Sequence, residues 1–160
     1  MSAAVAIRVL SAADAGACDA IVESLPYHFG DAGGREQCAR AVRESQGLVA
    51  VEDGRVIGFL TWRRPYPRSA EITWMAVQAG RRREGVGGAL VVALAERLPG
   101  EVRHLLVTTL SPSTPEPDVG DSYAGTRRFY ESNGFDPVWE PRGWWNAESQ
   151  ALLMLRPLGG

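Results

Sequence analysis

The sequence contains no lysine, and arginine supplies all 17 of its strongly basic side chains. The protein therefore offers no lysine side chain of its own for covalent modification. Basic residues form no dense block apart from three consecutive arginines at residues 81–83, and the net charge is −2. A nucleic-acid partner is disfavoured, because binding to phosphates requires a broad basic face.

Cysteine is scarce as well, since Cys18 and Cys38 are the only two. Their spacing fits neither a metal-ligand motif nor CxxC, so we expect two buried thiols in a reducing compartment and no metal site. No apolar run is long enough to cross a membrane, and the first residues lack the basic and apolar regions of a signal peptide. These absences predict a cytoplasmic protein with no membrane partner.

What is present predicts a folded domain that contains both helices and strands. A length of 160 residues suits one domain, which we expect to span residues 1–160. Segments with the apolar spacing of strands alternate with helix-like segments, and hairpins are expected as well. The fold class is therefore α/β (α+β), with a partly antiparallel sheet flanked by helices.

Turn and cap residues set the expected boundaries of these elements. Ser11 and Asp14 have the spacing of a capping box, Asp53-Gly54 is a two-residue hairpin turn, and Gly134 ends a helix. The prolines at residues 65 and 67 mark another turn. Helices are expected at residues 11–25, 35–45, 89–98 and 123–132. Strands are expected at residues 4–10, 48–52, 56–62, 71–77, 102–110, 135–140 and 151–156.

The most informative segment is a glycine turn at residues 82–88, which read Arg-Arg-Glu-Gly-Val-Gly-Gly. It follows a strand-like run and precedes a helix-like run. Glycines let a ligand approach the backbone, and the N–H groups of a first helical turn attract phosphate together with the helix dipole. Neighbouring arginines can pair with phosphate oxygens. The glycine turn therefore predicts a ligand that carries a pyrophosphate.

Two well-known nucleotide-binding loops do not fit this turn. A P-loop requires GxxxxGK and then Ser or Thr, but Gly80 to Gly85 is followed by Val86. A dinucleotide fingerprint requires GxGxxG, whereas Gly85, Gly87 and Gly88 form GxGG. The alternative to a ligand-binding turn is a tight strand-to-helix connection with no ligand, beside a solvated cluster of arginines.

Three segments form one pattern through their sequences and their order along the chain. They are residues 70–77 (Ala-Glu-Ile-Thr-Trp-Met-Ala-Val), residues 82–87 (Arg-Arg-Glu-Gly-Val-Gly) and residues 128–135 (Arg-Phe-Tyr-Glu-Ser-Asn-Gly-Phe). They resemble the fourth strand, the acyl-CoA motif and the end of the fourth helix of the GCN5-related N-acetyltransferase (GNAT) family. The resemblance covers nearly the whole chain. It implies a GNAT-like domain with a central mixed, mostly antiparallel sheet of six to seven strands and about four flanking helices.

The resemblance implies acetyl-CoA as cofactor and direct transfer of its acetyl group to a primary amine through a tetrahedral intermediate, an acyltransferase reaction of the EC 2.3.1 type. Backbone after the fourth strand's kink is expected to pair with the pantetheine arm, and an amide there could stabilise the oxyanion. The glycine turn is expected to cradle the pyrophosphate. The implied cofactor-binding residues are Met75, Ala76, Val77, Arg82, Arg83, Glu84, Gly85, Val86, Gly87, Gly88 and Thr126.

Two catalytic residues are also implied by the resemblance. Tyr130 occupies the family's general-acid position, where it would protonate the leaving thiolate, and packing under the sheet is the alternative. Glu71 aligns with the catalytic glutamate of histone-type members, and a solvated glutamate at a strand start is the alternative. His28 is a rival base because imidazole titrates near neutral pH, although loop packing also suits it.

The fourth-helix segment departs from the family pattern at two positions. Many members carry asparagine where this chain has Tyr123 and alanine where it has Thr126. Both residues share a helix face with Tyr130. The family's contact from asparagine to pantetheine is thus lost, and a hydroxyl of Tyr123 or Thr126 could replace it.

Aromatic residues in two loops bear on the acceptor. Family acceptor sites lie between loops that here carry Tyr27, His28 and Phe29 in one and Trp144 and Trp145 in the other. Aromatic faces attract cations, so the expected acceptor is a small amine with an apolar body. Two alternatives remain, a protein or peptide N-acetyltransferase and a non-catalytic acyl-CoA-binding sensor. Homodimers are common in the family, but no heptad or apolar stripe indicates one here.

Overall fold

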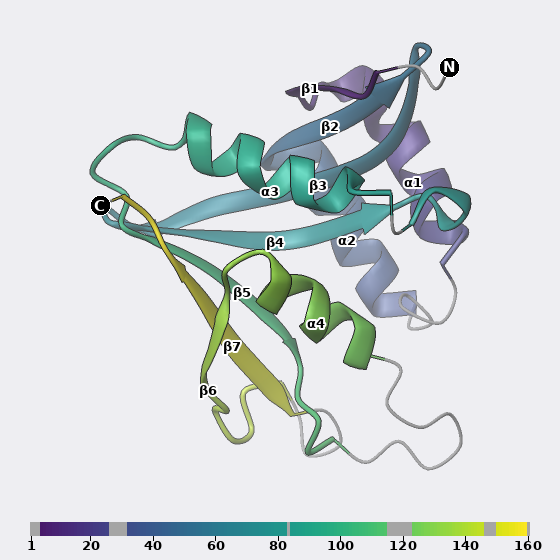
Figure 1. Ribbon diagram of the computed structural model, residues 1–160. Helices are drawn as coiled ribbons and strands as arrows, with labels where there is room; N and C mark the ends of the chain where they lie inside the picture. Colours follow the sequence, from purple (N-terminus) through teal and green to yellow (C-terminus); the bar gives the residue numbers. More distant parts are fainter. Residues whose placement is uncertain (1–3, 26–31, 83, 115–122, 146–149, 160) are drawn as a thin grey trace. The chain divides into compact units, whose positions relative to one another are not determined.

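The structure is a computed structural model that describes residues 4–25, 32–82, 84–114, 123–145 and 150–159 (Figure 1). These residues contain four α-helices, α1 (Ala15–Glu23), α2 (Ala32–Glu44), α3 (Val86–Arg97) and α4 (Ala124–Ser132), and two short 3₁₀ helices, η1 (Ala12–Asp14) and η2 (Ala79–Arg81). The strands are β1 (Ala6–Val9), β2 (Gln46–Glu52), β3 (Arg55–Tyr66), β4 (Ser69–Val77), β5 (His104–Leu110), β6 (Asp136–Trp139) and β7 (Ala151–Pro157).

The chain forms two compact units, one of Met1–Arg63 with Ile72–Leu98 and one of Arg64–Glu71 with Pro99–Gly160. The strand order is β1-β2-β3-β4, with most of β3 and β4 in the first unit, and β5-β7-β6 in the second. The pairs β1–β2, β2–β3, β5–β7 and β6–β7 are antiparallel. The predicted α/β (α+β) class, with a mixed and mostly antiparallel sheet and four helices, is confirmed.

The β2–β3 hairpin closes on the two-residue turn that the sequence predicts. Asp53 and Gly54 have φ angles of 50° and 75°, and a type I′ turn requires positive φ at both positions. Glu52 pairs with Arg55 on either side of this turn. The backbone of Glu52 is therefore fixed by the hairpin.

A β-bulge interrupts β3 shortly after the hairpin. The pairing register between β2 and β3 skips Ile57, which is thus an extra residue in β3. The carbonyl of Ile57 accepts a hydrogen bond of 2.8 Å from the N–H of Gln78, the residue that follows β4. The bulge consequently fixes the end of β4, from which the chain enters the glycine turn.

Both cysteines lie in the core of the first unit. Cys18 of α1 and Cys38 of α2 have no exposed surface and belong to a cluster with Val49 and Phe59 of the sheet. Burial raises the pKa of each thiol to about 12, so both stay protonated at neutral pH. The prediction of two buried, unpaired thiols is confirmed.

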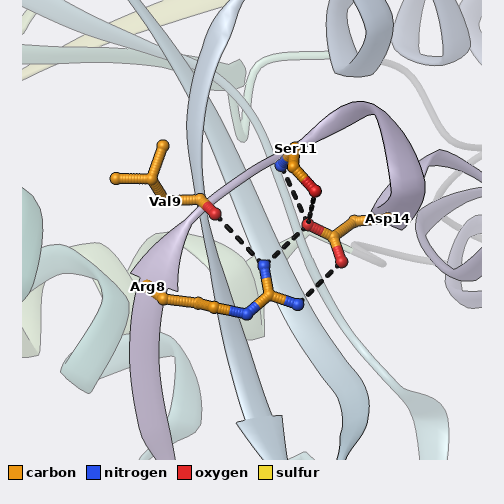
Figure 2. A network of polar contacts seen from close by, with 4 residues as sticks. All are labelled: Arg8, Val9, Ser11 and Asp14. Carbon is orange, nitrogen blue, oxygen red and sulfur yellow. Dashed lines mark hydrogen bonds and ion pairs between the residues drawn. The ribbon is translucent and has the colours of Figure 1, made fainter.

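Figure 2 shows how the carboxylate of Asp14 ties β1 to the first helical segment. The guanidinium of Arg8 donates a hydrogen bond of 2.8 Å to each carboxylate oxygen, and the N–H of Ser11 donates one of 2.9 Å to Oδ2. The hydrogen bonds from Arg8 are the largest cause that lowers the pKa of Asp14, to about 2. The predicted pairing of Ser11 with Asp14 is confirmed, and it lies at η1, which leads directly into α1.

In the second unit, the end of α4 is set by a glycine, as predicted. Gly134 has a φ of 87°, and the N–H of Phe135 donates a hydrogen bond of 3.0 Å to the carbonyl of Tyr130. The side chain of Phe135 is fully buried beyond the turn. The backbone around Tyr130 is therefore held at the end of its helix.

Three predicted boundaries are wrong by three residues or more, and each error arises at residues that disfavour the element they occupy. Helix α2 begins at Ala32 and not at Arg35, so it includes Gly33 and Gly34. Helix α3 begins at Val86 and not at Ala89, so Gly87 and Gly88 form part of its first turn. Glycine weakens a helix interior, but the first turn tolerates it better because its N–H groups have no intrahelical hydrogen bonds to lose. Strand β3 runs to Tyr66 and includes Pro65, and the turn occupies residues 67–68.

Candidate active site

The glycine turn brings a row of backbone amides to the N-terminus of α3. Gly85 is the N-cap residue, and the hydrogen bond of 3.0 Å from the N–H of Ala89 to its carbonyl starts the helical ladder. The amides of Val86, Gly87 and Gly88 precede that ladder, where a helix leaves its N–H groups available to a ligand. Together with the positive end of the helix dipole, these amides form a site suited to phosphate.

The geometry at Gly85 fits a bulky ligand. Its φ of 84° lies in the left-handed region that glycine adopts without a Cβ penalty. A Cβ built on Gly85 would have no atom within 4 Å, so the space beside the backbone is open. Arg82, with extended backbone and an exposed side chain, lies three residues earlier. The Cβ side of Gly85 is therefore open to a ligand.

A second glycine, Gly58 of β3, sets how closely α3 approaches the sheet. A Cβ on Gly58 would come within 3.2 Å of Val86 Cγ1 and 3.3 Å of the Ala76 carbonyl oxygen. Such contacts are tighter than ordinary van der Waals contact, so a Cβ here would require Val86 or the Ala76 carbonyl to move by a few tenths of an ångström. Sequence reasoning missed Gly58, and its only signal was a glycine inside a strand-like run.

Arg81, the last residue of η2, is held by two carboxylates. Its Nε donates a hydrogen bond of 2.6 Å to Glu84 within the glycine turn, and its Nη1 donates to Glu52 at the end of β2. The side chain of Glu52 is only 10% exposed. Both hydrogen bonds raise the pKa of Arg81, and the one to Glu52 is the larger cause. The hydrogen bond between Arg81 and Glu52 also lowers the pKa of Glu52. Sequence reasoning missed this network.

The backbone residues expected to pair with pantetheine lie in the same unit as the glycine turn. Ala76 is buried, and Met75 and Val77 are half-buried at the end of β4. Glu71, the candidate base, is half-buried near the start of β4 and belongs to the second unit. The structure thus brings the backbone at the end of β4 and the glycine turn into one compact unit.

Tyr130, the candidate general acid, is a buried residue of α4. Its ring makes edge-on contacts with Phe129 and Phe135, with centroid distances of 5.1 and 5.3 Å. Burial raises the pKa of the phenol above its ordinary value of about 10. Tyr130 therefore keeps its proton across the physiological pH range, as a donor must.

Arg127 anchors α4 one turn before Tyr130, and sequence reasoning missed it. The side chain is 8% exposed, and its Nη1 donates a hydrogen bond of 2.6 Å to the carbonyl of Leu110 at the end of β5. Arginine is seldom buried without partners, but nothing in the sequence indicates its direction. Thr126, which the sequence analysis predicts to bind the cofactor, is half-buried. Tyr123 at the N-cap of α4 is half-buried as well.

The acceptor residues are only partly described. Tyr27, His28 and Phe29 lie outside the described residues, as does Arg83 of the glycine turn. Trp144 and Trp145 are 51% and 43% exposed. Trp144 also lies 6.1 Å, between ring centroids, from Trp139 of β6, which is itself exposed. Trp139 was missed, because a tryptophan in a strand-like run is expected to be buried.

A comparison with protein families identifies one family. The family model "Acetyltransferase (GNAT) domain" matches residues 43–137. No curated protein matches the chain. Within the described residues, no helix is both long and apolar enough to cross a membrane.

Three solved structures have similar folds. A protein of the GNAT family from Desulfovibrio desulfuricans is 24% identical, with a TM-score of 0.82 and coverage of 98% of this chain and 100% of that one. The ribosomal-protein-S18-alanine N-acetyltransferase of Escherichia coli is 20% identical, with a TM-score of 0.76 and coverage of 98% and 96%. An aminoglycoside 6′-N-acetyltransferase in complex with coenzyme A is 16% identical, with a TM-score of 0.71 and coverage of 97% and 98%.

Proposed function

The chain belongs to the GNAT acetyltransferase family, and from this premise we propose that it transfers the acetyl group of acetyl-CoA to the primary amine of a small molecule. Membership makes it an N-acetyltransferase of the EC 2.3.1 type, and acetyl-CoA is the cosubstrate of the family. The single observation that carries the proposal is the glycine turn, with its open backbone at Gly85 and its row of amides at the start of α3.

The chain's own residues would hold acetyl-CoA mainly through backbone groups. The amides of Val86, Gly87 and Gly88 would donate to the pyrophosphate, with the exposed guanidinium of Arg82 beside them. The backbone of residues 75–77 would pair with the pantetheine arm, and one of its N–H groups would donate to the acetyl oxygen. When bound, acetyl-CoA supplies the activated acetyl group and a thiolate leaving group.

We assign Tyr130 as the donor to that thiolate. A thiol titrates near 8.5, below a buried phenol, so complete proton transfer from Tyr130 is unfavourable in an apolar site. A hydrogen bond from Oη–H to the sulfur stabilises the departing charge without requiring full transfer. The proton that finally neutralises the thiolate then comes from the amine that has reacted.

Glu71 is the proposed base for the acceptor amine. A carboxylate in general titrates far below an alkylammonium, so removal of the proton is uphill and must be coupled to attack by the amine. His28 stays the rival base. Substitution of each by the nearest neutral residue, Glu71→Gln and His28→Asn, should lower kcat at pH 7 only for the residue that serves as base.

The small-molecule acceptor is supported by exposed tryptophans of the second unit. Trp139, Trp144 and Trp145 present aromatic surface that attracts a cationic amine with an apolar body. An alternative acceptor is an amine of a protein, since the E. coli enzyme with a similar fold is named for an alanine of a ribosomal protein.

A thiol-release assay tests the proposal directly. Acetyl-CoA is supplied with a panel of small aromatic and aliphatic amines and, separately, with peptides that have an unblocked N-terminus. Turnover with small amines is expected. Turnover with peptides alone would overturn the small-molecule acceptor, and tight binding of acetyl-CoA without turnover of any amine would identify a sensor.

A further inference from the structure

The three consecutive arginines beside the glycine turn do not share one role, because Arg81 already has two carboxylate partners. Its Nε donates to Glu84 over 2.6 Å, and its Nη1 donates to Glu52. Two of the five N–H donors of this guanidinium are thus engaged, and its charge is paired with two carboxylates. Arg82, by contrast, is exposed.

The partner on one side, Glu52, is a rigid anchor. It ends β2 and pairs with Arg55 across the type I′ turn, so its backbone belongs to a closed hairpin. Its side chain is 10% exposed, which restricts the rotamers available to it. An ion pair costs least when one partner is already ordered, because little conformational entropy remains to be lost.

The partner on the other side, Glu84, belongs to the element that must be held. It directly precedes Gly85, whose left-handed backbone leads into α3. Glu84 is half exposed, at 50%, and glycines on its C-terminal side give that backbone many alternative conformations. A turn of this composition needs an external contact if it is to present its amides in one arrangement.

We propose that Arg81 is a positioning residue that ties the glycine turn to the β2–β3 hairpin, with Glu52 as the anchor and Glu84 as the point of attachment. The proposal rests on the proposed function, since the turn is held in order to bind the pyrophosphate of acetyl-CoA. Arg81 also neutralises two carboxylates that would otherwise repel an anion at the turn.

The test uses Arg81→Gln, Glu52→Gln and the double variant in the full chain. Each single variant should raise the KM for acetyl-CoA about fivefold with kcat within about twofold. The reason is that the contacts of Arg81 with Glu52 and Glu84 support the binding of acetyl-CoA in the ground state. The double variant should equal the single ones, because each change breaks the same contact. Arg43→Gln is the matched control. It removes an arginine that pairs with Asp19 between α1 and α2 of the same unit, and KM should not change.

A second measurement needs no ligand. Hydrogen exchange of the unliganded protein, read on peptides that cover residues 84–90, should be faster in Arg81→Gln and Glu52→Gln and unchanged in Arg43→Gln. An unaltered KM together with unaltered hydrogen exchange in both variants would overturn the proposal that Arg81 positions the glycine turn. If the wild-type protein binds no acetyl-CoA, the proposed function fails, and the exchange experiment still decides whether Arg81 orders the turn.

Discussion

Substitution of Gly85 by alanine separates the conformational role of the glycine turn from its role in binding. Gly85 has a φ of 84°, and alanine in the left-handed region costs about 1 kcal/mol relative to glycine. A Cβ at this position has no protein atom within 4 Å, so no steric term is added. The free energy of unfolding should fall by about 1 kcal/mol, which corresponds to a Tm about 3 °C lower in a chain of this size.

Gly54→Ala is the matched control. Gly54 has a φ of 75° in the β2–β3 hairpin, and a Cβ there also has no atom within 4 Å. The same loss of stability is expected. The two variants should therefore have similar Tm values in thermal unfolding followed by circular dichroism, and they should differ only in what happens at the ligand.

Binding of acetyl-CoA should distinguish the two variants. A methyl group beside the amides of α3 would push a phosphate away and lose at least one charge-assisted hydrogen bond, worth about 1.5–3 kcal/mol. The Kd for acetyl-CoA, measured by calorimetry, should rise about tenfold to about a hundredfold in Gly85→Ala and stay unchanged in Gly54→Ala. Equal Kd values in Gly85→Ala, Gly54→Ala and the wild type would refute the assignment of the turn to the pyrophosphate.

Three further predictions concern other residues. Tyr130→Phe should lower kcat about a hundredfold with little change in the Kd for acetyl-CoA, and wild-type turnover would remove Tyr130 as the donor. Gly58→Ala would force Val86 or the Ala76 carbonyl to move, so the free energy of unfolding should fall by about 1–3 kcal/mol. The KM for acetyl-CoA should rise as well. A loss of stability with an unchanged KM would show that the glycine turn does not depend on Gly58. The pKa of Asp14 is lowered to about 2, so its ion pair contributes fully above about pH 4 and is lost as the pH falls towards 2. Asp14→Asn should therefore cost about 2 kcal/mol at pH 7 and little at pH 2 in urea unfolding, and an equal cost at both pH values would contradict this.

The elements predicted well are those whose residues interact with near neighbours in sequence. The positive φ at Asp53 and Gly54, the hydrogen bond from Ser11 to Asp14 and the glycine end of α4 all depend on contacts within a few residues. Such contacts are encoded in short patterns that a sequence displays directly. The start of α3 was misplaced because glycine carries a low helix propensity wherever it stands.

The missed parts of the site are contacts between distant residues. Arg81 meets Glu52 across a separation of 29 residues, and Arg127 meets Leu110 across 17. In the sequence, Arg81 is one of three adjacent arginines, and nothing distinguishes it from Arg82. The side chain's direction depends on which strand end lies beside it, and that depends on the register of the sheet.

The sequence by itself determined a ligand that carries a pyrophosphate, because the glycine turn carries this chemistry in its residue types and local spacing. Acetyl-CoA and the reaction were implied by the resemblance of the glycine turn, the β4 segment and the α4 segment to the GNAT family. The sequence also determined the fold class, through the alternation of strand-like and helix-like segments. Only the tertiary structure decided that Arg81 is occupied by two carboxylates, that Gly58 admits the start of α3, and that Tyr130 is buried with a raised pKa. These properties depend on packing and on desolvation, which arise only when segments distant in the sequence come together.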